Sequence, residues 1–549
     1  MKPSAAMTPH LATAAITVVF ALVCSAFVYQ ATLSSFADDS VSYLVMAQTF
    51  SPWQSAGLPV REAFAAETTY PPLFPLVLAL SGLSHDIGGA HVAVALLLAA
   101  CLAVQYLVAL RWLGRPALAV AAVAVTATLP CMWVHAKGIL SEPLFLLVAL
   151  LLLSALESRR RPVALALLFA ALALTRTVGL VMVLAWAAAS QARRLSSSQR
   201  WQQAWPALAA VGAYALWVLL RPAVPDQYAS VVAENARGLA GSEAIIPAIA
   251  ARVASQAQAM GEAWVAALEL FRTEDRPGRT LVAVVLGLFA IAGLSLRLRG
   301  GKQDPWMMIA YLAVYLVWPY PAQMSRFLFP LVPILVLYAF YAAAALAERA
   351  PRWSRAAPLV AAAPFLALSA PALAFIAERA RLGHPEGFSA ITDWYTTPDL
   401  ALARRRASVH LDLLEDMSMI REKVPPGERV MWVTPAYIAL LADRPGVSAP
   451  SPELPTVEYL QFVQASGVRY VFLSRYHPRR TTSEADWRKG LEVLPGLGDA
   501  LAARIDRVTG QSSSVLFYLR PTGALPTGTL APMYPQPFRD CPVFPRSAA

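Results

Sequence analysis

The sequence predicts an α-helical polytopic membrane protein that carries a soluble α/β domain at its C-terminal end. Hydrophobic residues make up 57% of the 549 residues, and the mean hydropathy is +0.52, which excludes a string of soluble domains. Long apolar segments recur through residues 1–377, with arginines clustered in the short segments between them. From residue 378 onwards, short buried strands alternate with helical segments.

The formal net charge of +11 does not indicate nucleic-acid binding, because the basic residues follow the positive-inside rule. With the N-terminus in the cytoplasm, every basic cluster falls on the cytoplasmic side of the membrane. The clusters are Arg111 and Arg115, Arg159 to Arg161, Arg193 and Arg194, Arg297 to Lys302, and Arg349 to Arg355. This arrangement predicts about eleven spans plus a short broken helical hairpin, and places the C-terminal domain outside the cytoplasm.

The first span is expected near residues 11–33, which form too long an apolar segment for a cleaved signal peptide. Further spans are expected near 89–110, 116–134, 140–156, 203–221, 280–296, 305–319, 327–347 and 357–377. Two large external loops, 34–85 and 222–279, lie between them.

Residues 162–190 are apolar but have arginines at both ends and a break at Thr175–Gly179. We therefore expect a hairpin of two short helices with Arg176 at its apex, because each arm is shorter than the roughly twenty residues of a span. Broken helices of this kind occur where they line a cavity.

The region 378–520 reads as a periplasmic α/β domain with a mostly parallel sheet. Buried strands are expected at 429–433, 470–473 and 514–518, and helices near 408–423, 456–466 and 484–504. Residues 521–549 are rich in proline and are expected to form an extended tail.

Two adjacent carboxylates, Asp38 and Asp39, follow the first span and open an amphipathic segment. Asp39 shares one helical stripe with Tyr43, Met46, Ala47 and Phe50, which places a charge on the apolar side of the helix. Both aspartates are suited to capping this helix at its N-terminus. A carboxylate at the membrane rim is equally suited to taking a proton from a hydroxyl nucleophile or to holding a cation.

Other charged residues fall on the same external side. Glu142 opens the fourth span. It is either an acid that stabilises the start of this helix or a second acid that faces Asp39. Arg176 requires an anionic partner or water at depth, unless it extends to the outer surface. Arg326, His135 and Lys137 are either interfacial loop residues or cations of the same site. An anionic lipid head group requires fixed cations for its phosphate, and a hydroxyl acceptor requires a carboxylate base.

Several motifs resemble those of GT-C glycosyltransferases, in particular the bacterial protein O-mannosyltransferase-like and aminoarabinose-transferase-like enzymes. They are Asp39-Ser40-x-x-Tyr43-x-x-x-Ala47, Tyr70 to Leu76, Ser141 to Phe145, Thr175 to Leu180, and Arg326 to Pro333. The resemblance covers most of the membrane region.

The resemblance implies transfer of a sugar from a polyprenyl-phosphate donor to a lipid, glycan or protein acceptor on the periplasmic face of the bacterial inner membrane. It implies Asp39 as the candidate base, with Asp38 beside it, and Glu142 as the second acid. Arg176 and Arg326 match positions that line the donor site. Tyr43 and Tyr70, which belong to the first two motifs, are placed with His135 and Lys137 among the substrate-binding residues.

The resemblance leaves open whether the transfer is metal-independent or assisted by a divalent cation, and no His/Cys metal cluster is present in the sequence. The chain also departs from these families. Ser40 follows Asp39 where a glutamate is common, and Tyr70 stands where the aminoarabinose-transferase-like enzymes have a lysine, so their lipid A specificity does not carry over.

A transporter or flippase of lipid-linked glycans is the alternative. It predicts charged groups near the membrane midplane and internal repeat symmetry. In this sequence the polar groups cluster at external ends and no internal repeat is visible, which favours the enzyme. A scaffold without catalytic activity would need no acidic motif.

Overall fold

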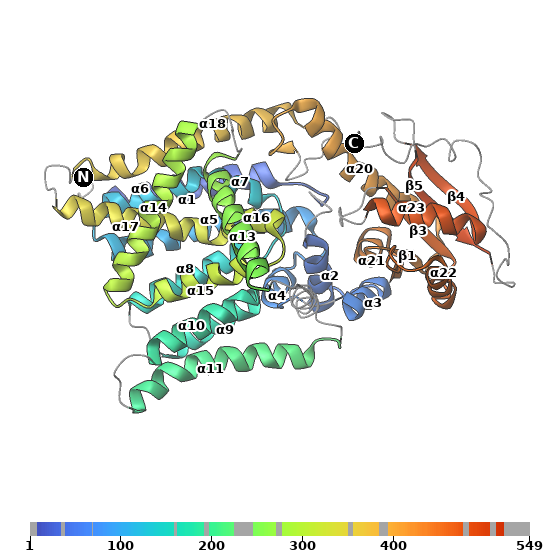
Figure 1. Ribbon diagram of the computed structural model, residues 1–549, viewed down its shortest axis with the longest axis horizontal. Coiled ribbons are helices and arrows are strands. Elements are labelled where there is room, and N and C mark those ends of the chain that lie inside the picture. The colour runs from blue at the N-terminus through green and yellow to red at the C-terminus, as the bar shows by residue number, and fades with distance from the viewer. Residues whose placement is uncertain are drawn as a thin grey trace.

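A bundle of apolar helices and a smaller sheet domain at one end of it make up the computed structural model (Figure 1). The structure describes residues 8–33, 39–67, 70–158, 162–191, 197–223, 245–270, 277–349, 355–383, 394–475, 483–505 and 512–520. The predicted helical membrane architecture with a C-terminal sheet domain is confirmed. The proline-rich tail predicted for 521–549 lies outside the described residues.

Five described helical stretches are long and apolar enough to cross a membrane. They are α1 (Thr8–Val28), α5 (Ile87–Leu113), α14 (Pro277–Arg299), the stretch Pro321–Arg349, and α18 (Ala357–Leu382). The stretch Pro321–Arg349 contains η1 (Pro321–Gln323), α16 (Met324–Leu328), η2 (Phe329–Leu331) and α17 (Val332–Arg349). These helices make the chain a multi-pass membrane protein, whereas the total of about eleven spans stays a prediction.

A sixth span is formed by α6 (Pro116–Thr128) and α7 (Pro130–Ala136) if this pair, bent by 50°, is counted as one. The bend falls at Leu129, which has an extended backbone, because the residue before a proline is driven out of the helical conformation. The helix α8 (Glu142–Glu157) follows and returns through the bundle.

The predicted break near Arg176 is confirmed. Two helices of 14 residues, α9 (Pro162–Thr175) and α10 (Val178–Gln191), are separated only by Arg176 and Thr177. A Cβ atom on Gly179 would lie 2.4 Å from the carbonyl oxygen of Leu172, so this turn accepts only glycine. Each arm is about 21 Å long, shorter than the hydrocarbon core of a bilayer.

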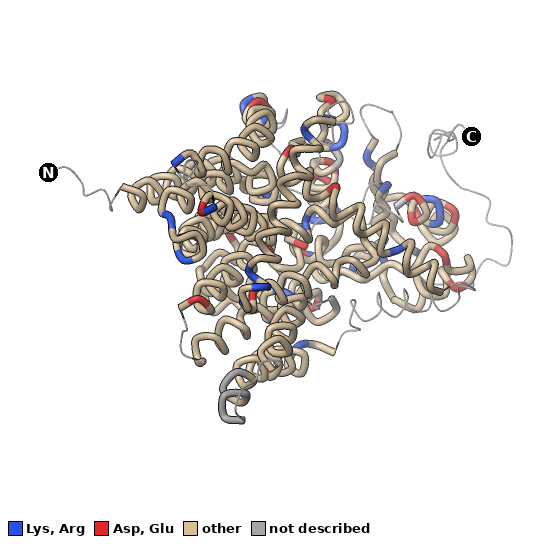
Figure 2. The backbone as a smooth tube through the Cα atoms, turned by 60° about the vertical axis from the view of Figure 1, so that its left-hand side comes forward, with Lys and Arg blue, Asp and Glu red and all other residues tan. Residues whose placement is uncertain are grey.

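Further helices surround this bundle. The first external loop contains α2 (Ser40–Phe50), α3 (Leu58–Glu67) and α4 (Leu73–Leu80). The remaining helices of the membrane region are α11 (Ser197–Leu220), α13 (Ile245–Glu269) and α15 (Asp304–Val317). Charged residues occupy short stretches of the backbone tube, and most of each helix carries none (Figure 2).

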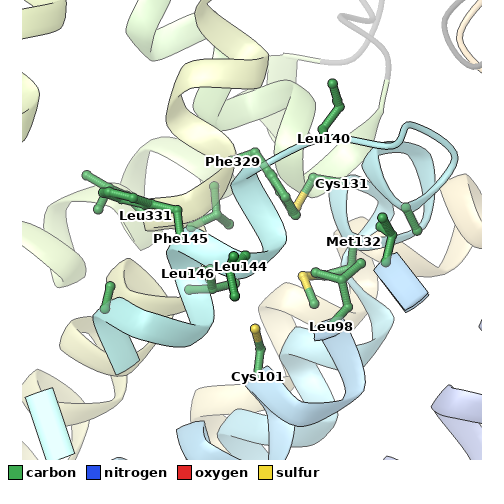
Figure 3. Packing of buried hydrophobic residues seen from close by; sticks show 14 of the residues in the cluster. Leu98, Cys101, Cys131, Met132, Leu140, Leu144, Phe145, Leu146, Phe329 and Leu331 are labelled. Carbon is green, nitrogen blue, oxygen red and sulfur yellow. The ribbon is translucent and has the colours of Figure 1, made fainter. Parts of the chain in front are cut away.

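Apolar side chains fill the interior of the bundle. Figure 3 shows Leu98 and Cys101 of α5 on the side of α8 that carries Leu144, and the buried residues Phe145 and Leu331 on its other side. Cys24, Cys101 and Cys131 are buried and form no disulfide, as is typical of cysteines that act as small apolar side chains of a core.

The C-terminal domain has five strands in the order β2-β1-β3-β5-β4. They are β1 (Val430–Trp432), β2 (Gly446–Ser448), β3 (Tyr470–Ser474), β4 (Gly498–Ile505) and β5 (Ser512–Leu519). Its helices are α20 (Leu400–Lys423), α21 (Pro435–Tyr437), α22 (Thr456–Ala465) and α23 (Ser483–Val493).

The prediction of a mostly parallel sheet is wrong. Strand β1 is parallel to β2 and β3, but β5 is antiparallel to both β3 and β4. The helix predicted for 484–504 ends at Val493, and β4 takes its last third. Strands β4 and β5 are consecutive in the chain, and such neighbours pair most simply as antiparallel strands.

The C-terminal domain packs against the first external loop. The helix α21 and the π-helical turn Ile438–Ala442 contact α2 and α3, as their positions in Figure 1 show. Ala63 of α3 belongs to the same hydrophobic cluster as that turn. Arg429, directly before β1, lies 3.5 Å from Glu62 of α3. The helix that begins after Asp39 therefore has the C-terminal domain on one side and the bundle on the other.

Candidate active site

The side chain of Asp39 does not cap the helix it precedes. Asp39 occupies the N-cap position of α2 but makes no side-chain capping hydrogen bond. Its Oδ1 accepts a hydrogen bond from the hydroxyl of Tyr70 at 2.8 Å, and its Oδ2 pairs with Nη2 of Arg326 at 2.5 Å. Asp39 therefore joins a polar cluster far from it in sequence. Asp38 lies outside the described residues.

Glu142 joins the two arginines predicted to line the site. Its Oε1 lies 2.6 Å from Nη1 of Arg176 and 2.5 Å from Nε of Arg326. The carboxylate is 1% exposed, so it is buried together with the opposite charges that a buried carboxylate requires. Arg176 has the anionic partner that its position in a broken apolar hairpin predicts, and it does not extend to the outer surface.

Tyr43 adds a hydroxyl to this cluster. Its OH lies 2.8 Å from Oγ of Ser141, and Nη1 of Arg176 donates to the same Oγ at 3.3 Å. The Tyr43 ring packs against the Tyr70 ring at 5.2 Å. Burial, followed by the nearby Asp39 and Glu142 carboxylates, raises the pKa of Tyr43, so its hydroxyl stays protonated and serves as a hydrogen-bonding group.

Five separate parts of the chain thus meet in one hydrogen-bonded cluster, which we call the carboxylate–arginine cluster: Asp39, Tyr43, Tyr70, Ser141, Glu142, Arg176 and Arg326. The start of α2, the start of α8, the α9–α10 break and α16 each supply a charged member. Two carboxylates balance two guanidinium groups, so the cluster is neutral until a ligand enters.

His135 and Lys137 lie at different distances from this cluster. The His135 ring stacks on Phe329 at 4.6 Å, in the segment that follows Arg326. The Lys137 amine instead donates to the carbonyl oxygen of Phe27 and lies over the rings of Phe27 and Tyr395. The structure does not bring Lys137 to the carboxylates, and its role in substrate binding stays a prediction.

Sequence reasoning did not single out two residues of this region, Ser141 in the cluster and Tyr311 beside it. Ser141 stands in the Ser-Glu motif but reads as an ordinary N-cap, although its hydroxyl makes no capping hydrogen bond. Tyr311 of α15 donates to the carbonyl oxygen of Phe327 at 2.6 Å and thereby fixes the turn that carries Arg326. Nothing in an apolar helix distinguishes such a tyrosine from a core residue.

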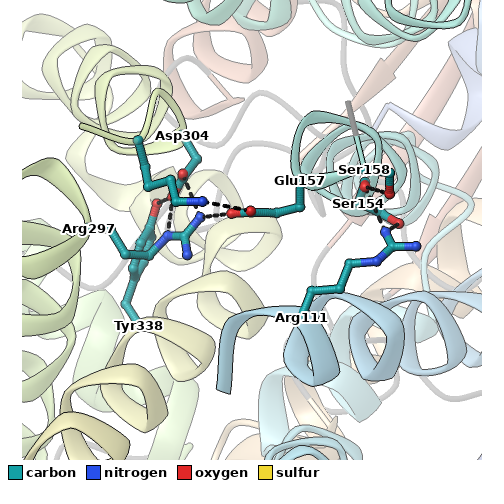
Figure 4. Close-up of polar contacts among 8 residues, drawn as sticks. Arg111, Ser154, Glu157, Ser158, Arg297, Asp304 and Tyr338 are labelled. Atoms are coloured by element: carbon teal, nitrogen blue, oxygen red, sulfur yellow. Dashed lines mark hydrogen bonds and ion pairs between the residues drawn. The ribbon is translucent and has the colours of Figure 1, made fainter. Parts of the chain in front are cut away.

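A second charged cluster lies at the other end of α8. Arg297 pairs with Asp304 at 2.8 Å and with Glu157, and Tyr338 donates to Asp304 at 2.6 Å (Figure 4). Because Glu142 and Glu157 are the first and last residues of α8, the two clusters are separated by about 22 Å. Every carboxylate in the second cluster has a basic partner, which suits a structural role.

In the described part of the chain, no group of three or more His, Cys, Asp or Glu residues is placed to hold a metal ion. Asp39 and Glu142 are the two carboxylates that a divalent cation would have to share. Arg326 bridges them in this structure, and waters or substrate phosphates would have to complete the coordination of a cation held by two carboxylates.

No protein-family model and no curated protein matches this chain in sequence. Solved structures resemble it in fold. The archaeal oligosaccharyltransferase AglB from Archaeoglobus fulgidus, in complex with an inhibitory peptide and a dolichol-phosphate, is 12% identical, with a TM-score of 0.49 over 91% of this chain and 74% of that one. ArnT from Cupriavidus metallidurans bound to undecaprenyl phosphate is 13% identical, with a TM-score of 0.49 over 92% and 97%.

The mycobacterial arabinofuranosyltransferase AftD is 15% identical, with a TM-score of 0.39 over 93% of this chain and 40% of that one. These structural neighbours are GT-C glycosyltransferases.

Proposed function

We propose that this protein is a membrane glycosyltransferase that moves a sugar from a polyprenyl-phosphate donor to an acceptor on the extracytoplasmic face of a bacterial inner membrane. The observation that carries the proposal is the carboxylate–arginine cluster. It combines carboxylates with two guanidinium groups, and this reaction requires a base for the nucleophile and fixed cations for the phosphate. A lipid, a glycan or a protein with a free hydroxyl suits the acceptor.

In the proposed reaction, Asp39 takes the proton of the acceptor hydroxyl while its oxygen attacks the anomeric carbon of the donor sugar. The bond from that carbon to the phosphate oxygen breaks, and the phosphate leaves with the electron pair. Arg326 uses Nε and Nη2 for the two carboxylates, and Arg176 uses Nη1 for Glu142. Their remaining N–H groups suit the oxygens of the leaving phosphate. His135, beside Arg326, is placed to contact the same lipid.

The proposal includes a topology. The first domain, residues 1–377, would have about eleven spans with a cytoplasmic N-terminus, and the second, 378–520, would lie in the periplasm. Support comes from the C-terminal end of α14, where Arg297 and Arg299 lie in the last turn, as basic residues at a cytoplasmic end do. The carboxylate–arginine cluster would then lie at the periplasmic end of the bundle.

The positions of the charges favour this proposal over a lipid-linked glycan transporter. A transporter is expected to place its charged groups near the midplane. The two charged clusters described above instead lie at the two ends of α8.

Binding of undecaprenyl phosphate to the purified protein tests the proposal. We expect Arg176→Met and Arg326→Met each to weaken binding about thirtyfold, because a hydrogen bond to a charged group contributes about 2 kcal/mol. Arg61→Met, on the exposed face of α3, is the matched control and should bind as the wild type does. Equal affinity in all four proteins, with unchanged melting temperatures, would contradict the phosphate-binding role.

A further inference from the structure

Glu142 has one carboxylate oxygen that accepts no hydrogen bond from the described residues. Its Oε1 pairs with Arg176 and Arg326, whereas its Oε2 is buried and has no hydrogen-bond partner. An unpaired buried acceptor is destabilising unless a ligand or water satisfies it. The ion pairs of Glu142 therefore do not account for the whole side chain.

A hydroxyl hydrogen is left over next to this oxygen. Tyr43 and Ser141 carry two hydroxyl hydrogens, and one of them lies in the 2.8 Å contact between the two oxygens. Arg176 can only donate, so its contact with Ser141 Oγ uses no further hydroxyl hydrogen. Whichever of the two hydroxyls donates to the other, one O–H of the pair has no acceptor among the described residues.

The spare donor and the spare acceptor belong to side chains that are linked through Arg176. The same nitrogen, Nη1 of Arg176, is 3.3 Å from Ser141 Oγ and 2.6 Å from Glu142 Oε1. The two oxygens are therefore no further apart than the sum of these distances, and Oε2 is on the same carboxylate. A single group placed between them would accept from the hydroxyl pair and donate to Glu142.

We propose that the Tyr43–Ser141 hydroxyl pair and Glu142 Oε2 together bind a ring hydroxyl of the lipid-linked sugar, and that the site selects sugars that carry this hydroxyl. An alcohol both accepts and donates a hydrogen bond, as this site requires, whereas a phosphate oxygen cannot donate to Glu142. The hydroxyl comes from the sugar of the polyprenyl-linked lipid. Arg176, which is assigned above to the phosphate of this lipid, contacts both Ser141 and Glu142, and the sugar is attached to that phosphate. This inference rests on the proposed function and adds Ser141 to the residues of the site.

The hydrogen-bond count makes a specific prediction about substitutions. In Ser141→Ala the Tyr43 hydroxyl can still donate to the sugar, and in Tyr43→Phe the Ser141 hydroxyl can. Each single change therefore leaves one donor, and only the double variant leaves none. We expect the double variant to lose far more affinity than the two single losses combined.

The test measures the binding of two lipids to the full-length protein. One is undecaprenyl phosphate, and the other is the polyprenyl-linked monosaccharide extracted from cells that produce Asp39→Asn. The more-than-additive loss is expected for the sugar-bearing lipid and not for undecaprenyl phosphate. Ser158→Ala and Tyr106→Phe, whose hydroxyls bond outside the cluster, are the matched controls. The inference would be overturned if the double variant lost only the sum of the two single losses in affinity, and lost it equally for both lipids.

Analogues of the sugar-bearing lipid give a second readout that does not depend on folding of a variant. Among monodeoxy analogues, one ring position should lose transfer by about a hundredfold or more, as in sites built to pair a substrate hydroxyl. The fluoro analogue at that position should also fail, because fluorine cannot donate to Glu142. Equal transfer with all analogues would show that water fills the site. If wild-type protein binds no undecaprenyl phosphate and Asp39→Asn cells accumulate no lipid-linked sugar, the proposed function itself fails.

Discussion

Asp39 and Glu142 each lie where a helix starts, so the sequence alone does not decide whether they cap a helix or belong to a site. An acid at a helix start is typical of a cap and equally typical of a site built at a helix end. The deciding contacts come from Tyr70, Arg176 and Arg326, which are 31 to 287 positions away from Asp39 or Glu142 in the chain. The candidate residues were therefore predictable from their motifs, whereas their pairing required the fold.

Tyr70 offers a prediction for a single side chain. Its hydroxyl donates to Asp39 Oδ1, so Tyr70→Phe should leave the carboxylate less well oriented. We expect kcat to fall about tenfold with little change in KM, because a hydrogen bond to a charged group contributes about 1.5 kcal/mol. Steady-state kinetics of sugar transfer measure this, with the exposed Tyr29→Phe as control. A raised KM at unchanged kcat would place Tyr70 in ground-state binding instead.

The membrane helices could be predicted well because their apolar lengths and flanking arginines are strong local signals. The expected spans near 89–110, 280–296 and 357–377 correspond to α5, α14 and α18. The strands β2 and β4 were missed. Strand β2 has only three residues, and β4 is mostly exposed, so neither has the continuous apolar pattern of a buried strand.

The α9–α10 break gives a prediction for an element. Gly179→Ala would push a methyl group against the Leu172 carbonyl and shift the turn that carries Arg176. We expect a loss of about 1–3 kcal/mol in stability together with weaker binding of undecaprenyl phosphate. Gly212→Ala in α11, where a Cβ meets nothing within 4 Å, is the control and should not destabilise the protein, because alanine favours a helix more than glycine does. Thermal unfolding and lipid binding are measured on the same samples, and unchanged values for Gly179→Ala would mean that the turn is not constrained.

At the scale of the whole molecule, the C-terminal domain and the bundle share one hydrophobic cluster that passes through α2 and α3. The sequence predicted a separate domain but not this contact, because α3 alone shows no strong apolar face. The packing indicates that the domain holds in place the helix that follows Asp39.

Ala63→Arg should disturb this packing, because it buries a large cation where Ala63 is 4% exposed. We expect faster hydrogen exchange in 40–50 and 435–442 and at least a tenfold lower rate of transfer, with the bundle helices still protected. Ala66→Arg, on the exposed face of the same helix, should change neither quantity. Full transfer by Ala63→Arg despite faster exchange would separate the domain contact from catalysis.

The most direct test of the central claim compares cells that carry the wild-type protein with cells that carry Asp39→Asn. Mass spectrometry measures their polyprenyl-phosphate sugars and their surface glycans at equal protein levels. We predict that one lipid-linked monosaccharide accumulates in the variant while one surface sugar is lost, because transfer stops without its base. Unchanged pools of both would contradict Asp39 as the catalytic base and the glycosyltransferase built around it.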